Sequence, residues 1–507
     1  GQGHTCLPFN VLMKRIGALE VTHQASEAAI SNLLSQDQLR QYQTVDPAVR
    51  PIYLSSMDWV ESFVAQRLGE ISATAPPPVS APPLDKLSNQ MDIQLSSEQQ
   101  AAIQLALRFG VSVITGGPGT GKTTIMRVLL ASARSAQESW ALAAPTGRAA
   151  QRLGESTGAI AKTIHRTLEY NGRTGVFEKN HDNLLDVDGV LVDEASMVDT
   201  RLMAALLAAI PPRCRLVLVG DADQLPSVGA GQVLHDIIQS GEIPVATLHM
   251  VFRQAEGSEI IENAHAVNQG QIPVSHERSP NQHSGPGDFF VVSRENALEA
   301  QRTIIEIVTK RLPALGFDAM TDVQVLAPMH NGALGTVALN EKLQKALNPT
   351  GPSVTKGDQE FRLGDRVLQM RNDYDNDVFN GDVGRVVQVN DSDLVVDFNG
   401  REVHIVGERI RDLRLGYAVS VHKSQGSEYP AVVIALHSSH RIMLQRNLLY
   451  TGLTRASRFC CIVGNSWAIE TAVKTQGVAS GFQRDAKTGG NQHRWTRLQE
   501  RLQRSAT

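Results

Sequence analysis

The sequence predicts an α/β protein built on two parallel β-sheets whose faces are covered by helices. In two separate regions of the chain, apolar runs of strand length alternate with amphipathic segments of helix length. This alternation is typical of parallel strands joined by crossover helices. Between the two regions, short alternating strands separated by Asn, Asp and Gly turns predict a compact antiparallel insertion. We therefore expect two α/β domains, the second of which carries a small β domain.

Length and composition exclude several classes of protein. The 507 residues are enough for about three to five domains, which excludes a small single-domain binder. Hydrophobic residues make up 42% of the chain, and no apolar run approaches the roughly 18 residues of a membrane span. The net charge of −4 provides no global basic field, so any contact with nucleic acid must be local. The four cysteines lack the spacing of a metal site or a disulfide framework, which indicates a reducing compartment.

The first 90 residues carry no recognisable chemistry. Residues 1–72 contain short amphipathic segments that predict a helical N-terminal accessory domain. Five prolines in residues 76–83 favour extended backbone over packing. We therefore predict a linker over residues 73–90.

The first α/β domain, predicted over residues 91–253, contains a phosphate-binding motif. The run GGPGTGKT at residues 116–123 fits the pattern G-x-x-x-x-G-K-[ST] and lies between an apolar strand and an amphipathic helix. Backbone N–H groups of such a loop converge on phosphate oxygens, while Lys122 reaches the β- and γ-phosphates and the Thr123 hydroxyl binds Mg²⁺. The motif thus predicts ATP and Mg²⁺ as cofactors. The predicted nucleotide contacts are Gly117, Gly119, Thr120, Gly121, Lys122, Thr123 and Thr124.

Two further strands of this domain lead into polar residues. Residues 190–192 are followed by Asp193 and Glu194, and carboxylates at the carboxyl end of a parallel strand lie at the ligand-binding edge of the sheet. We expect Asp193 to hold the metal ion and Glu194 to orient or deprotonate the attacking water. The strand at residues 216–219 leads to Gln224, whose amide is a candidate sensor of the γ-phosphate.

Phosphoryl transfer also needs positive charge beyond Lys122. Arg253, in VFRQ, and Arg455, in LYTGLTR, are the candidates. If these arginines come from the second α/β domain or its border, the nucleotide lies in a cleft between the domains. Hydrolysis would then open and close that cleft.

The remaining segments complete the predicted architecture. Residues 168–180 contain an Asn-Gly turn between short strands, which predicts a β-hairpin projecting from the first domain. The second α/β domain is predicted over residues 254–340 and 416–485, with the β insertion over residues 341–415. Residues 486–507 are rich in Arg and predict a basic, solvated tail.

Eight motifs occur in the order of superfamily-one helicases, and residues 93–470 most closely resemble the RecD-like branch. The motifs are LSSEQ at 95–99, GGPGTGKT at 116–123, APTGRAA at 144–150, DEAS at 193–196, GDADQLPSVG at 220–229, FRQ at 252–254, VHKSQGSEY at 421–429 and YTGLTRA at 450–456. The resemblance implies two RecA-like P-loop domains and a small SH3-like β-barrel as the insertion. Stand-alone members of this branch usually carry a longer N-terminal extension, so we expect a shorter homologue or an N-terminally truncated chain.

The resemblance also implies roles for individual residues. Gln99 would read the adenine, Glu428 would contact the ribose, and Gln224, Arg253 and Arg455 would act as γ-phosphate sensors and arginine finger. The hairpin would be the pin that splits the duplex, with Asn171, Gly172 and Arg173 as its wedge. The implied DNA contacts, whose hydroxyl, amide and imidazole groups suit sequence-independent binding of the backbone, are Pro145, Thr146, Thr163, His165, His330, Asn331, His422 and Thr454.

The leading hypothesis is an ATP-dependent DNA helicase that moves 5′ to 3′ on single-stranded DNA, in DNA repair or recombination. We expect a monomeric motor in the bacterial cytoplasm, associated with the nucleoid and not with a membrane. Its expected partners are single-stranded DNA, single-strand/duplex junctions and a repair or single-strand-binding protein. Two alternatives stay open: an RNA helicase or translocase on the same core, because backbone contacts do not exclude RNA, and a nucleotide-dependent switch module that never unwinds.

Overall fold

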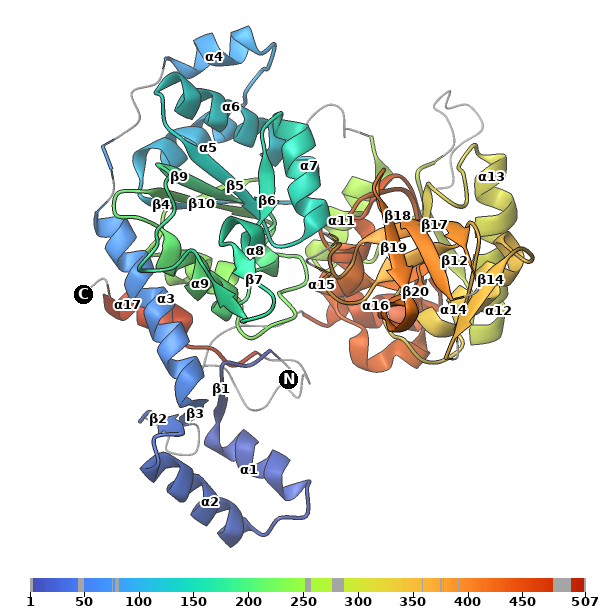
Figure 1. Ribbon diagram of the computed structural model, residues 1–507, viewed down its shortest axis with the longest axis horizontal. Coiled ribbons are helices and arrows are strands. Elements are labelled where there is room, and N and C mark those ends of the chain that lie inside the picture. Colours follow the sequence, from blue (N-terminus) through green and yellow to red (C-terminus); the bar gives the residue numbers. More distant parts are fainter. Residues whose placement is uncertain are drawn as a thin grey trace.

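The computed structural model describes residues 3–43, 50–74, 76–77, 82–250, 257–275, 287–357, 359–373, 376, 378–390, 392–476 and 494–505. Two α/β domains lie side by side, and small N-terminal elements extend from the first of them (Figure 1). Both domains contain a parallel sheet, so the predicted fold class is confirmed. Within the described residues, no helix is both long enough and apolar enough to cross a membrane.

The sheet of the first domain has six parallel strands in the order β11-β4-β10-β9-β5-β6. Its strands are β4 (Val111–Gly116), β5 (Trp140–Ala144), β6 (Ala161–Thr163), β9 (Gly189–Val192), β10 (Arg215–Gly220) and β11 (Val245–Leu248). Strands β4 and β10 are buried along their whole length, as expected for parallel strands covered on both faces. The helices are α5 (Ser97–Arg108), α6 (Lys122–Ser135), α7 (Gly147–Thr157), α8 (Ile164–Thr167), η2 (Ala195–Met197), α9 (Thr200–Ala209) and α10 (Val233–Ser240).

The sheet of the second domain has five parallel strands in the order β12-β23-β22-β13-β21. Its strands are β12 (Phe289–Ser293), β13 (Val323–Ala327), β21 (Ala418–Ser420), β22 (Tyr429–Leu436) and β23 (Ala456–Gly464). Cys460 and Cys461 lie in β23 as buried core residues with free thiols. The helices are α11 (Glu259–Asn268), α12 (Ala297–Glu306), η3 (Ile307–Arg311), α13 (Leu312–Ala314), α14 (Thr336–Leu347), η5 (Val421–Ser424), η6 (Ser438–Met443), α15 (Arg446–Leu453) and α16 (Ser466–Lys474).

The insertion between α14 and β21 forms a five-stranded antiparallel sheet in the order β19-β18-β17-β16-β20, beside the hairpin β14-β15. Its elements are β14 (Ser353–Lys356), β15 (Gln359–Arg362), β16 (Arg366–Gln369), β17 (Val383–Val389), β18 (Asp393–Asp397), β19 (Glu402–Val406), η4 (Gly407–Asp412) and β20 (Leu413–Leu415). Its apolar residues share one core with those of the second domain. The predicted start at residue 341 falls inside α14, which continues to Leu347 and buries Leu343 before the first strand of the insertion begins at Ser353.

The N-terminal part combines helices with a small sheet. The predicted helices are α1 (Phe9–Gly17), α2 (His23–Ser35) and α3 (Ser55–Ala73). A three-stranded antiparallel sheet, which the sequence analysis did not anticipate, accompanies them and consists of β1 (Cys6–Pro8), β2 (Leu39–Gln41) and β3 (Pro51–Leu54). The predicted linker over residues 73–90 is also too long, because α4 (Leu84–Gln90) is helical and buries Leu87.

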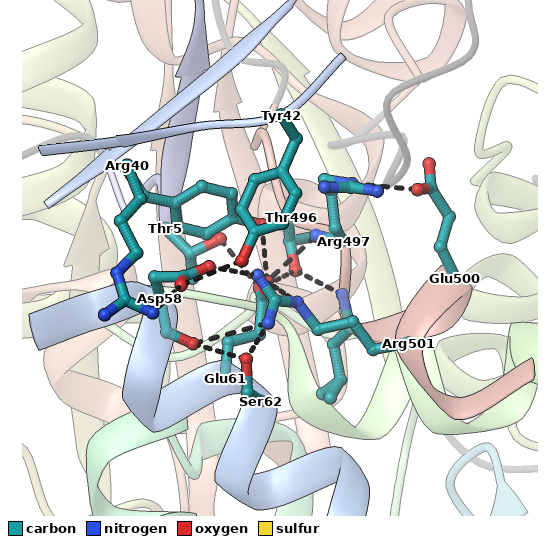
Figure 2. A network of polar contacts seen from close by, with 12 residues as sticks. Thr5, Arg40, Tyr42, Asp58, Glu61, Ser62, Thr496, Arg497, Glu500 and Arg501 are labelled. Atoms are coloured by element: carbon teal, nitrogen blue, oxygen red, sulfur yellow. Dashed lines mark hydrogen bonds and ion pairs between the residues drawn. The ribbon is translucent and has the colours of Figure 1, made fainter. Parts of the chain in front are cut away.

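The prediction of a solvated basic tail over residues 486–507 is wrong for its described part, residues 494–505. Helix α17 (Leu498–Ser505) packs against α3 and α10, and the side chains of Leu498 and Leu502 are buried. Arg501 of this segment forms ion pairs with the buried carboxylates of Asp58 and Glu61 in α3 (Figure 2). The basic residues of this segment predict a solvated surface, but Arg501 instead forms buried ion pairs with α3.

Candidate active site

The phosphate loop connects β4 to α6 and is held open by glycine conformations. Gly119 and Gly121 have φ values of +74° and +79°, a left-handed region that favours glycine. The Lys122 ammonium donates to the carbonyl oxygens of Gly116 at 2.6 Å and Gly117 at 2.8 Å. The lysine thus points back over its own loop, at the N-terminus of α6, where anions bind favourably.

The phosphate loop opens into a cleft of about 630 Å³ that is lined by both α/β domains. The structure places most of the predicted nucleotide and catalytic residues in this one cleft. They are Gln99, Gly119, Thr120, Gly121, Lys122, Thr123, Thr124, Asp193, Glu194 and Gln224 from the first domain, and Glu428, Thr454 and Arg455 from the second. The predicted sensor Arg253 lies outside the described residues.

Asp193 and Glu194 follow β9 at the wall of the cleft. Glu194 has a φ of +51°, which is unusual for a residue with a side chain and is typical of strained functional positions. Its backbone N–H donates to the Asp193 carboxylate at 2.9 Å. Burial, together with the charge of Glu194, raises the pKa of Asp193 well above its usual range. A cation bound beside Asp193 would remove this cost, so the site suits a metal ion.

Asp221, after β10, links Gln224 to the second domain. Its Oδ2 accepts hydrogen bonds from Gln224 Nε2 at 3.1 Å and from the Tyr450 hydroxyl of α15 at 2.8 Å. Burial raises the pKa of Asp221, although Lys122 and the Tyr450 hydrogen bond oppose the shift. The Oε1 atom of Gln224 is buried and has no hydrogen-bond partner among the described residues. Because Gln224 also lines the cleft, this acceptor is available to a donor bound there.

The next residue, Leu225, is bonded to the second domain through its backbone. Its N–H donates to Thr451 Oγ1 at 2.8 Å, and its carbonyl accepts from Gln425 Nε2 at 2.7 Å. The loop that follows β10 and carries Gln224 is therefore bonded to two segments of the second domain, at Gln425 and at Thr451. A shift between the domains must move or break these contacts.

A second set of contacts crosses the cleft from α7. Arg148 donates to the Ser427 hydroxyl and to the Tyr429 hydroxyl, both at 3.0 Å. Arg152 forms an ion pair with Glu428. Burial alone would raise the pKa of Tyr429, but the charges of Arg148 and Arg366 more than offset it, so the pKa is lowered.

Arg455 and Thr454 lie on the second-domain side of the cleft. The Arg455 guanidinium is buried and donates to the carbonyls of Thr451 and Ser427 and to the Thr454 hydroxyl. Thr454, a predicted DNA contact, also lines the cleft beside Arg455.

Gln99 is fixed at the edge of the phosphate loop. Its side chain closes a capping box with Ser96 at the start of α5, and its Nε2 donates to the Thr120 carbonyl at 3.3 Å. The predicted adenine-reading amide is thus held against the phosphate loop.

Several cleft residues were missed by the sequence analysis. A Cβ atom added to Gly117 would lie 3.1 Å from both the Tyr450 hydroxyl and the Cε1 atom of His265, so both side chains press on the phosphate loop. Arg148 and Tyr450 lie inside motifs already noted, where their polar character was a usable signal, and Arg152 follows the motif at residues 144–150. His265 lies in α11 outside any motif, and only the packing of α11 reveals it.

The predicted DNA contacts follow the carboxyl ends of four parallel strands. Pro145 and Thr146 follow β5, Thr163 ends β6, His330 and Asn331 follow β13, and His422 follows β21. Thr146 and Thr163 cap helices through their hydroxyls. Burial lowers the pKa of His422, and the charges of Arg494 and His330 lower it further.

The predicted hairpin is present as β7 (Tyr170–Asn171) paired with β8 (Val176–Phe177). The Asn-Gly pair is not its two-residue turn, because Asn171 ends β7 and the Gly175 N–H donates to the Asn171 carbonyl at 2.8 Å. The tip, residues 172–175, is exposed. The rings of Tyr170 and Phe177 lie 5.5 and 5.6 Å from that of His165, so His165, a predicted DNA contact, supports the base of the hairpin.

A second cavity of about 320 Å³ separates α7, β6 and α8 from the insertion. Basic side chains line it beside aromatic rings of the insertion, and Arg166 lies 5.4 Å from the centre of the Phe379 ring. Asn399 of the insertion donates to Gln151 of α7 at 3.2 Å across the same boundary. Positive charge next to aromatic rings suits a nucleic-acid strand.

Comparisons with known proteins agree with this geometry. Residues 94–283 match a family model described as an AAA domain, residues 339–398 the SH3 domain of ATP-dependent RecD-like DNA helicases, and residues 415–463 a UvrD-like helicase C-terminal domain. The "ATP-dependent RecD2 DNA helicase" of Deinococcus radiodurans is 40% identical over 75% of this chain and 50% of its own length. The "RecBCD enzyme subunit RecD" of Mycolicibacterium smegmatis is 33% identical over 78% of this chain and 75% of its own. The chain thus spans half the length of the Deinococcus relative.

Among solved structures, a Bacteroides Pif1 helicase in complex with ADP-AlF3 and single-stranded DNA aligns with a TM-score of 0.48 at 19% identity. The alignment covers 75% of this chain and 94% of that one.

Replacing Tyr450 with Phe removes only the hydroxyl that bridges the second domain to Asp221. We expect kcat for ATP hydrolysis to fall about tenfold with little change in KM, because Gln224 is then positioned less well. Tyr417→Phe is the matched control, since Tyr417 is also buried and donates to Asp365 at 2.8 Å, outside the cleft. Steady-state ATPase assays on both variants test this, and a wild-type kcat for Tyr450→Phe would contradict it.

Proposed function

The chain belongs to the RecD-like family of superfamily-one DNA helicases, and from this premise we propose that it hydrolyses ATP to move 5′ to 3′ along single-stranded DNA and to unwind duplex. The observation that carries the proposal is the shared cleft. The phosphate loop and the carboxylates of one domain line the same cleft, of about 630 Å³, as Arg455 of the other domain. Binding and hydrolysis there can change how the two domains sit together.

We assign a residue to each step of hydrolysis. ATP phosphates would bind the loop amides, and Lys122 would exchange its bonds to the Gly116 and Gly117 carbonyls for phosphate oxygens. Thr123 and Asp193 would hold a magnesium ion, which supplies charge neutralisation at the phosphates. Glu194 would accept a proton from the water that attacks the γ-phosphorus as the bond to the β-phosphate oxygen breaks.

Gln224, Arg253 and Arg455 would sense the γ-phosphate and its loss. Gln224 is suited to this because its Nε2 is held by Asp221 while its neighbour Leu225 is bonded to the second domain. Loss of the phosphate would release Arg455 and weaken the attraction between the cleft walls. The domains would then separate, and the contacts that Arg148 and Arg152 make with the second domain would break and re-form.

The proposed DNA path crosses the carboxyl edges of both sheets. Thr146, Thr163, His330, Asn331 and His422 lie there, with the basic and aromatic cavity beside the insertion. These groups suit sugar and phosphate rather than base edges, which supports sequence-independent movement. We further propose a role in DNA repair or recombination, in the cytoplasm and as a monomeric motor that meets a single-strand-binding or repair protein. The Mycolicibacterium relative is named as a subunit of a RecBCD enzyme.

Glu194→Gln tests the assignment of the base. The change keeps the shape of the side chain but removes its basicity, so we expect hydrolysis to fall about 100-fold or more while ATP and DNA binding persist. ATPase assays and binding of a fluorescent ATP analogue measure the two effects. Glu155→Gln, an exposed site on α7, is the control and should leave both unchanged. Intact turnover in Glu194→Gln would remove Glu194 from the mechanism.

Shortening the hairpin tests the wedge. Replacing residues 171–176 by two glycines removes the exposed tip but keeps Tyr170 and Phe177 packed on His165. We expect DNA-stimulated ATPase within about twofold of wild type and loss of strand separation, because translocation needs no wedge and unwinding does. Normal unwinding of a tailed duplex by the shortened protein would show that the hairpin is an inert surface feature.

A further inference from the structure

The chain returns from the second domain to the first near its end. Helix α16 of the second domain ends at Lys474, and the described segment 494–505 lies against α3, α10 and the N-terminal sheet (Figure 1). We call residues 494–505 the strap. Its first residue, Arg494, contacts the loop that follows β10.

Arg494 holds three carbonyls of one loop. Its Nη1 donates to Gly229 at 2.9 Å and to Gly231 at 2.8 Å, and its Nη2 donates to Ser227 at 2.6 Å. We call residues 227–231 the sensor loop, because they begin three residues after Gln224. A guanidinium presents its donors in a rigid fork, so these bonds fix the loop rather than merely attract it.

The sensor loop is fixed from its inner side as well. A Cβ atom on Gly229 would lie 1.9 Å from Asp199 Oδ2, so the backbone itself packs on the start of α9. Thr200 donates to the Ala230 carbonyl through its N–H at 3.0 Å and its hydroxyl at 2.9 Å. The loop is therefore clamped between α9 and Arg494.

The strap is itself anchored by a buried polar network. The Thr496 hydroxyl oxygen lies within hydrogen-bond distance of carboxylate oxygens of Glu61, at 2.7 Å, and of Asp236, at 2.9 Å. Arg501 forms ion pairs with Asp58 and Glu61 (Figure 2). The Trp495 carbonyl accepts from Thr5 N–H at 3.0 Å. Asp58, Glu61 and Asp236 are all buried, so the anchor is rigid.

The clamped loop leads straight into the interdomain contacts. Leu225, two residues before it, is bonded to Thr451 and Gln425 of the second domain. Burial lowers the pKa of His422 in the second domain, and the positive charge of Arg494 lowers it further. Through the sensor loop, Arg494 is linked to the segment in which Leu225 is bonded to the second domain.

We propose that Arg494 is a positioning residue for the motor: by holding the sensor loop, it keeps Gln224 facing the cleft and keeps Leu225 in contact with the second domain. This inference rests on the proposed function. Its consequence is that loss of Arg494 uncouples hydrolysis from domain movement while the nucleotide still binds.

The test compares Arg494→Ala, Arg494→Lys and the control Gln499→Ala, which removes only a contact from α17 to the Gln239 carbonyl. For Arg494→Ala we expect DNA-stimulated kcat to fall about tenfold with the KM for ATP within about twofold, and unwinding to fall further than hydrolysis. Arg494→Lys should recover part of the loss. Gln499→Ala should match wild type.

Hydrogen exchange supplies a readout that does not depend on helicase activity. In Arg494→Ala, with and without a non-hydrolysable ATP analogue, peptides covering residues 224–232 should exchange faster than in wild type. A purely structural strap predicts instead a lower melting temperature with unchanged kcat, unchanged coupling and unchanged exchange at residues 224–232, and that result would overturn the inference. If wild type shows no DNA-stimulated hydrolysis, the proposed function fails, and the exchange rates alone decide the role of Arg494.

Discussion

The hydrogen bond between the Tyr450 hydroxyl and Asp221 joins the two α/β domains beside the phosphate loop, and the arrangement of the site depends on it. Asp221 is buried, so its carboxylate needs donors, and it finds them in both domains: the Asp223 N–H and Gln224 in the first and Tyr450 in the second. Losing a donor to a buried carboxylate costs about 1.5–3 kcal/mol. The two domains therefore have a preferred relative position at which the sensor amide faces the cleft. In the proposed mechanism, nucleotide binding and hydrolysis next to Lys122 act on this contact between the two domains.

The two parallel sheets on either side of this hydrogen bond suit the proposed movement of the domains. Parallel strands bring every functional strand end to one edge, so the phosphate loop, the carboxylates and the sensor lie on neighbouring strands β4, β9 and β10. The apolar strands are packed too tightly to deform. Motion is therefore left to the polar contacts that cross the cleft. The strap and the buried acids of α3 hold the first-domain side of this boundary, while the insertion shares the core of the second domain.

The nucleotide site could largely be predicted from the sequence, because its residues lie in short motifs. GGPGTGKT predicts a loop conformation and a phosphate site together, and Asp193, Glu194 and Gln224 follow strands that any parallel sheet would align. Long-range partners could not be predicted. Arg501 resembles part of a solvated tail in the sequence, because its partners Asp58 and Glu61 lie more than 400 residues earlier. His265 gives no local signal, and the three-residue strands of the N-terminal sheet are too short to show alternation.

Strand separation on three duplexes, one with a 5′ tail, one with a 3′ tail and one blunt, tests most directly the claim that the cleft drives directional unwinding. ATP hydrolysis with and without single-stranded DNA is measured alongside, and tailed RNA duplexes serve as a parallel substrate. The account predicts DNA-stimulated hydrolysis and unwinding confined to the 5′-tailed DNA duplex. Hydrolysis that single-stranded DNA does not stimulate, with no strand separation on any duplex, would contradict it and would leave a nucleotide-dependent switch as the better description.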